Sequence, residues 1–135
     1  MKETLDLQSP EFTQHFVVSY LEKFDIEPHI AKIQATYKAR SDLMLEMIRK
    51  CFPASVKYTE PEGGMFLWLE LPGGLDADAL LDEALEAGVA YIPGESFYAN
   101  NGPKNTIRMN FTTVSEEQIV KGMEILGAVL KRHID

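Results

Sequence analysis

Residues 65–92, MFLWLELPGGLDADALLDEALEAGVAYI, contain the order of elements that decides the fold class of this chain. The first four residues are apolar in succession, which is typical of a strand covered on both faces. Pro72 and two glycines break that strand, and an amphipathic helix follows with Asp76 as its N-cap and Gly88 as its terminator. VAYI, residues 89–92, then predicts a further strand, which should be reached by a right-handed crossover if both strands share a sheet. The helix positions predicted to face inward are Ala77, Leu80, Leu81 and Ala84.

The next strand is predicted at NTIRMNFTT, residues 105–113. Ile107, Met109 and Phe111 alternate onto one face, and Arg108 lies on the other. A guanidinium in a strand that otherwise faces a core requires either open water on that side or an anion that it holds.

A loop from Pro93 to Lys104 separates these two strands, and loops of that length in compact domains tend to be functional. The closing helix begins with a capping box formed by Ser115 and Gln118. Its inward positions are predicted to be Ile119, Met123, Leu126 and Leu130.

Two helices are predicted before the strand–helix–strand unit. Ser9 should cap the first, with Pro10 in the first helical position, and this helix should end near Asp25. Pro28 opens a second, longer helix, and Pro53 stops it. The apolar stripe of the second helix is interrupted by Arg40 and consists of Ile30, Ile33, Tyr37, Met44, Met47 and Cys51.

SVKYT, residues 55–59, alternates like a half-buried strand and completes the order of elements. That order is helix, helix, strand, strand, helix, strand, strand, helix, without repeats or linkers. It predicts an α+β fold, an α/β two-layer sandwich, with a mixed sheet of about four strands packed with helices.

The amino-acid composition argues against two classes of binding partner. The net charge is −8 and the thirteen Lys and Arg residues are scattered, which argues against a nucleic-acid or anionic-membrane surface. Cys51 is the only cysteine, so no internal disulfide forms. No apolar run suits a signal peptide or a membrane helix, and we expect a cytoplasmic protein.

Metal sites are not favoured by the sequence. His15, His29 and His133 are far apart and lack the paired spacing of metal ligands. The acidic run that begins at Asp76 lacks the Gly and Glu that a calcium-binding loop requires at its sixth and twelfth positions, and a solvated helix face explains it better.

Two features remain as candidates for ligand binding. Gly64, the second of two glycines at the mouth of the apolar strand, would let a ligand approach the backbone closely, although turn formation also explains a double glycine. Arg108 is either exposed or salt-bridged, or it is a clamp for a carboxylate or phosphate, which its planar fork suits. The residues alone leave both alternatives open.

Several ordered segments together resemble a known family. PEGGMFLWLELPGG, an acidic helix, AGVAYIPGESFY, a Gly/Asn/Pro loop and IRMNFTTVSEEQI are similar to the C-terminal part of the fold-type I, class I/II aminotransferases that depend on pyridoxal phosphate. The similarity is greatest to the branch with 2-aminoadipate and kynurenine aminotransferases. HIAKIQATYKARSDLMLEMI resembles the long helix that leads into the same domain.

The resemblance implies roles for individual residues. In that family the arginine of the matching strand binds the α-carboxylate of the amino-acid or 2-oxo-acid substrate, and Arg108 occupies its position. Phe66 resembles a residue that lines the substrate side of the pocket, and Ile92 is implied as a further ligand contact. These expectations favour the clamp.

The departures from the family pattern are equally informative. The Ser/Thr-x-x-Lys segment that carries the Schiff-base lysine is absent, as are the aspartate for the pyridine nitrogen and the phosphate anchors. We therefore expect residues 1–135 to be a single C-terminal domain, with residues 1–27 as a lead-in helix that contacts a missing large domain. No cofactor is expected on this chain, which should be inactive alone, and the intact parent should be a pyridoxal-phosphate homodimer.

A competing hypothesis needs no missing domain. The chain would then be a freestanding, non-catalytic α+β module that binds a small carboxylate ligand or a protein partner through the face that carries Arg108.

Overall fold

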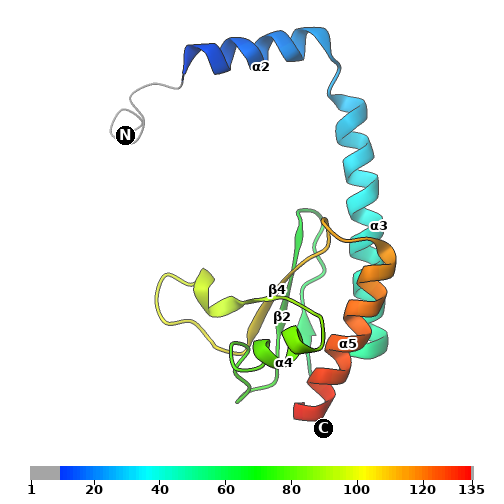
Figure 1. Cartoon of the computed structure of the whole chain (residues 1–135), viewed down its shortest axis with the longest axis vertical. Helices are drawn as coiled ribbons and strands as arrows, with labels where there is room; N and C mark the ends of the chain where they lie inside the picture. Colours follow the sequence, from blue (N-terminus) through cyan, green and yellow to red (C-terminus); the bar gives the residue numbers. More distant parts are fainter. Residues whose placement is uncertain (1–9, 135) are drawn as a thin grey trace. The chain divides into compact units, whose positions relative to one another are not determined.

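The computed structural model describes residues 10–134. The elements follow the predicted order (Figure 1). They are α2 (Glu11–Lys23), α3 (Glu27–Cys51), β1 (Lys57–Tyr58), β2 (Phe66–Glu70), α4 (Leu81–Glu86), β3 (Ile92–Pro93), the 3-10 helix η1 (Gly94–Phe97), β4 (Thr106–Asn110) and α5 (Glu116–Ile134). The chain forms two compact units, one ending at Ala35 and the other beginning at Thr36.

The first unit contains α2 and the start of α3. Pro10 is the N-cap of α2 and the helix begins at Glu11, one residue later than predicted. Ser9, the predicted cap, lies outside the described residues. No residue of α2 is buried within this chain, and Phe12 is 82% exposed.

The second unit contains a four-stranded sheet with the strand order β1-β2-β4-β3. All three neighbouring pairs are antiparallel. The prediction of a mixed sheet was therefore wrong. The strands β2 and β3 run in the same direction, but β4 lies between them and pairs antiparallel with each. The α+β fold class is as predicted, and the handedness of the crossover stays a prediction.

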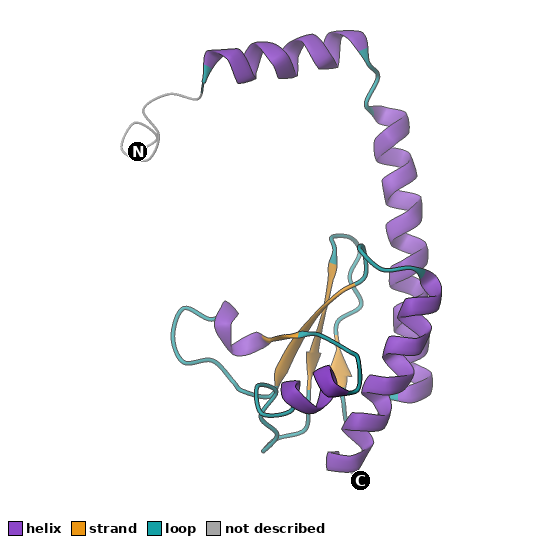
Figure 2. Ribbon diagram, in the orientation of Figure 1, coloured by secondary structure: helices purple, strands orange, loops and turns teal. Residues whose placement is uncertain are grey.

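One face of the sheet carries the core. Leu67, Leu69, Ile107 and Met109 point to this face and are at most 4% exposed. Figure 2 shows α5 and the end of α3 lying side by side next to the sheet, and their apolar residues belong to the same core. The core positions from these two helices are Met44, Met47, Ile48, Ile119, Met123, Leu126 and Leu130.

The other face of the sheet is not covered by a helical layer. Phe66 is 40% exposed and Trp68 is half-buried, so β2 is fully buried on one side only. The prediction that this strand is covered on both faces was wrong, because within residues 36–134 the outer face receives only the short helix η1 and its loop.

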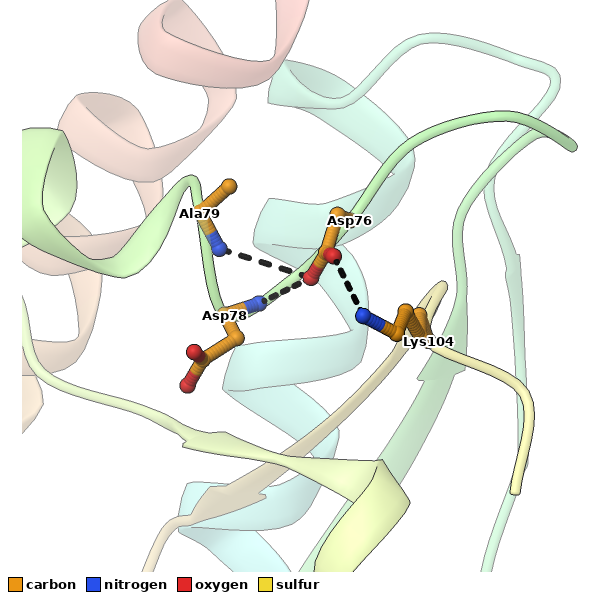
Figure 3. Close-up of polar contacts among 4 residues, drawn as sticks. All are labelled: Asp76, Asp78, Ala79 and Lys104. Atoms are coloured by element: carbon orange, nitrogen blue, oxygen red, sulfur yellow. Dashed lines mark hydrogen bonds and ion pairs between the residues drawn. The ribbon is translucent and has the colours of Figure 1, made fainter. Parts of the chain in front are cut away.

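The helix α4 is shorter than its sequence pattern suggests. Asp76 Oδ1 accepts hydrogen bonds from the backbone N–H groups of Asp78 (3.0 Å) and Ala79 (3.4 Å), and Lys104 Nζ lies 3.3 Å from Oδ2 (Figure 3). These contacts stabilise a turn that precedes the helix, so Leu80 and not Asp76 is the N-cap. Gly88, with φ of +95°, ends the helical segment as predicted.

The other predicted helix signals can be compared directly with the structure. Ser115 N–H donates to Gln118 Oε1 (2.9 Å) and Gln118 N–H donates to Ser115 Oγ (3.3 Å), which confirms the capping box. Arg40, which interrupts the apolar stripe of α3, donates a hydrogen bond from Nη1 to the carbonyl oxygen of Thr112 at 2.5 Å.

Candidate functional site

Arg108 lies at the centre of β4, where the Cα pairing sets it opposite Trp68 of β2 and Ile92 of β3. Its neighbours Ile107 and Met109 enter the core, so alternation along the strand directs Arg108 to the outer face of the sheet. The predicted split of this strand into two faces is confirmed.

Two aromatic rings flank the guanidinium of Arg108. The Cζ atom lies 4.2 Å from the ring centroid of Phe66 and 3.8 Å from that of Phe97. Both distances fall within the range of cation–π attraction. We call these three residues the Arg108 cluster.

The polar atoms of Arg108 are not satisfied by the described residues. Its Nε is buried without a hydrogen-bond partner, and within residues 10–134 no carboxylate forms an ion pair with the side chain. The residue is half-buried, so bulk water does not solvate it fully. A partly buried cation without a counter-ion is costly, and an anionic ligand would offset that cost. The salt-bridged reading of Arg108 is therefore wrong for this part of the chain.

The other predicted ligand-binding residues, Phe66, Ile92 and Gly64, differ in how closely they approach Arg108. Phe66 contacts the guanidinium directly, and Ile92, which is 45% exposed, is the Cα partner of Arg108 on β3. Gly64 precedes β2 with φ of +88° and open space where a side chain would lie, so its turn conformation already explains the glycine.

Phe97 was not predicted as part of the site. It belongs to η1, inside the segment expected to be an irregular loop. The aromatic pair Phe97-Tyr98 in a loop rich in Gly and Asn was the only signal of it in the sequence, and no periodicity placed it near Arg108.

A cavity of about 560 Å³ lies elsewhere in the second unit. It is bordered by the first half of α5, the segment after α4 and Met109, whose side chain faces the core. Arg108 does not line this cavity, so the cavity and the Arg108 cluster are separate features.

His133 and the acidic residues Glu83 and Asp76 have structural partners. His133 Nε2 lies 2.6 Å from Glu83 Oε2, and this hydrogen bond is the main reason that the pKa of Glu83 is lowered. The pKa of Asp76 is lowered chiefly by the backbone N–H of Asp78 and then by Lys104.

Between residues 10 and 134 no group of three His, Cys, Asp or Glu side chains could hold a metal ion. None of the helices in this range has the length and apolarity required to span a bilayer.

Comparison with known proteins places this arrangement in a family. The model for aminotransferase class I and II matches residues 5–126. The chain belongs to the class I and II aminotransferase family. It is 43% identical, over 98% of its length and 32% of the relative's, to the aromatic-amino-acid aminotransferase 1 of Thermococcus litoralis.

Solved aminotransferase structures have the same fold. The kynurenine aminotransferase of Pyrococcus horikoshii is 42% identical with a TM-score of 0.89, and the match covers 99% of this chain and 33% of that one. The α-aminoadipate aminotransferase LysN of Thermus thermophilus is 38% identical with a TM-score of 0.84, over 97% and 33%. This chain thus spans about a third of the length of the aminotransferases that it matches.

The cofactor of such aminotransferases needs groups that the Arg108 cluster does not contain. Pyridoxal phosphate requires an amine for its aldehyde, an acid for its ring nitrogen and donors for its phosphate. The cluster contains one guanidinium and two phenyl rings. The guanidinium can hold an anionic group, but the cluster contains neither the amine nor the acid that the cofactor requires, and we assign it no cofactor contact.

Proposed function

We propose that this chain is the C-terminal, substrate-binding domain of a larger pyridoxal-phosphate-dependent aminotransferase. The enzyme would exchange an amino group between an amino acid and a 2-oxo acid. The observation that carries this proposal is the half-buried guanidinium of Arg108, which lacks a counter-ion among the described residues. Its place in an aminotransferase fold makes the substrate's carboxylate the natural anion.

Arg108 would bind the α-carboxylate of the substrate through its planar fork. A bidentate, charge-assisted pair of this kind contributes roughly 1.5–3 kcal/mol. It would also fix the orientation of the Cα–H bond at which the cofactor, as an electron sink, supports proton removal.

Neighbouring residues would shape the rest of the substrate-binding surface. Phe66 and Ile92 are the exposed apolar side chains closest to Arg108 on β2 and β3, and they would contact the ligand. The open space at Gly64 would admit the ligand near the backbone. The preferred side chain of the substrate is left open by these contacts.

The remaining machinery would lie in a large domain outside this chain. That domain would supply the Schiff-base lysine and the cofactor anchors, so the isolated chain would not transaminate. Residues 1–27 would be the lead-in helix that contacts it, and the intact enzyme would be a homodimer. The exposed apolar side chains of α2 support such a contact, because patches of this kind usually mark interaction surfaces.

A conservative substitution in the whole enzyme tests the role of Arg108. Arg108→Lys keeps the charge but loses the planar fork, so kcat/KM for the amino acid should fall about tenfold or more. Arg49→Lys is the matched control, because Arg49 is an exposed arginine already paired with Glu60. Equal kinetics for Arg108→Lys and the wild type would contradict the proposal.

A further inference from the structure

The helix η1 lies directly on the sheet because its first residue, Gly94, has no side chain. A Cβ atom at Gly94 would lie 2.2 Å from Thr106 Oγ1 and 2.7 Å from Trp68 Cη2, so no other residue fits without a shift. A Cβ atom at Gly102 would lie 2.3 Å from the ring of Tyr98, which packs against this glycine. The start of η1 is therefore held against β2 and β4, and the loop closes on itself.

The anchoring at Gly94 fixes the place of Phe97, which belongs to the same short helix. Its ring contacts the edge of Trp68 at a centroid distance of 6.0 Å, and it lies 3.8 Å from the guanidinium carbon of Arg108. Phe66 reaches the same guanidinium from β2 at 4.2 Å. Arg108 Nε is the buried, unpaired atom of this arrangement, and its two terminal nitrogens form no hydrogen bond or ion pair with side chains of the described residues.

We propose that Phe97 is a positioning residue that, together with Phe66, holds the guanidinium of Arg108 ready for a carboxylate at its two terminal nitrogens. The inference rests on the proposed function, because it presumes that Arg108 binds a carboxylate. Phe97 acts through Arg108 and need not touch the ligand.

The physical reason is the freedom of a long side chain. An arginine that is not held loses many rotamers when it binds, and this lost entropy opposes binding. Ring contacts made before the ligand arrives remove part of that cost from the binding step. A guanidinium with a fixed plane also presents the fork that a bidentate carboxylate requires.

Tyr98 provides a matched control for Phe97. The two residues are neighbours with nearly equal exposure, 45% for Phe97 and 43% for Tyr98. Each meets the Trp68 ring edge-on, at 6.0 and 6.1 Å. Of these two residues, only Phe97 contacts the guanidinium of Arg108.

The test is an acetate titration of the 135-residue chain by 15N NMR, with acetamide as the neutral control. The Nε–Hε signal of Arg108 reports the ring contacts, and the indole N–H of Trp68, the single tryptophan, reports the face of the sheet beside it. Well-dispersed backbone signals verify the fold of each variant. In the wild type, Hε should be shifted upfield by the rings, and acetate but not acetamide should move both signals.

Phe97→Leu should lose part of the upfield shift and weaken acetate binding about two- to fivefold. Phe97→Tyr should restore both values, and Tyr98→Leu should leave both as in the wild type. If Phe97→Leu leaves the shift and the affinity unchanged, or if Tyr98→Leu lowers them equally, the positioning role is contradicted.

Arg108→Gln separates this outcome from a failure of the proposed function. Loss of the acetate response at Trp68 in this variant supports carboxylate binding by Arg108, whatever the Phe97 variants show. A wild type that ignores acetate, or an Arg108→Gln variant that responds normally, contradicts the proposed function and the positioning role together.

Discussion

At the scale of single residues, alternation along β4 correctly placed Arg108 on the face opposite the core. Phe66 and Ile92 were implied as ligand contacts by the resemblance to the family and not by alternation, and they belong to the two strands that pair with β4. Alternation could not find Phe97, because the position of η1 depends on close approach between Gly94 and residues of two distant strands. Contacts of that type have no periodic signature in the sequence.

Tyr91 gives a residue-scale test of the core. Its hydroxyl donates a 2.7 Å hydrogen bond to the carbonyl oxygen of Ala77, and burial, followed by the charges of Asp78 and Asp76, raises its pKa. Tyr91→Phe would leave that carbonyl unpaired, so the free energy of unfolding at pH 7 should fall by about 1–2 kcal/mol in urea titrations of this chain.

Tyr98→Phe is the control for this measurement, because the hydroxyl of Tyr98 has no hydrogen-bond partner in the described chain and its ring is exposed. Its unfolding free energy should stay within about 0.5 kcal/mol of the wild type. Equal stability of Tyr91→Phe and Tyr98→Phe would show that the buried hydrogen bond contributes nothing.

At the scale of elements, the long helices were predicted more accurately than the short strands. The capping box of α5 and the proline stop after α3 depend on neighbouring residues, which the sequence displays directly. The strands β1 and β3 contain only two residues each, and their bounds are set by pairing partners that lie far away in the chain. The predicted strand at residues 89–92 accordingly overlaps β3 only at Ile92.

The contact of α5 with the end of α3 gives a test at this scale. A Cβ atom at Gly127 would lie 2.6 Å from the backbone oxygen of Cys51, so Gly127→Ala should force the two helices apart. We expect a loss of about 1–3 kcal/mol in the free energy of unfolding, measured by denaturant titration.

Gly122 lies in the same helix and serves as the control. A Cβ atom there meets nothing closer than Val89 Cγ2 at 4.0 Å, so Gly122→Ala should raise stability by up to about 1 kcal/mol through helix propensity. If the two alanine variants change stability in the same direction and by the same amount, close packing at Gly127 is not the cause.

At the scale of the whole molecule, the order of elements predicted the α+β class, and the ordered motifs indicated the aminotransferase family. The strand order could not be predicted, because no local sequence signal indicates that β4 lies between β2 and β3. The strand MFLWLEL is apolar on both sides, yet among the residues that the structure describes only its inner face is buried. We attribute the uncovered side to its proposed place at a substrate site between this domain and the rest of the enzyme.

The central claim is that Arg108 binds the carboxylate of the substrate, and a cycle of substrate and protein changes tests it most directly. Single-turnover rates of the whole enzyme are compared for an amino acid and for the amine that lacks only its carboxylate, each with the wild type and Arg108→Gln. If Arg108 binds the carboxylate, Arg108→Gln should lower kcat/KM about 100-fold for the amino acid and less than about threefold for the amine. Equal losses for the two substrates would contradict this claim.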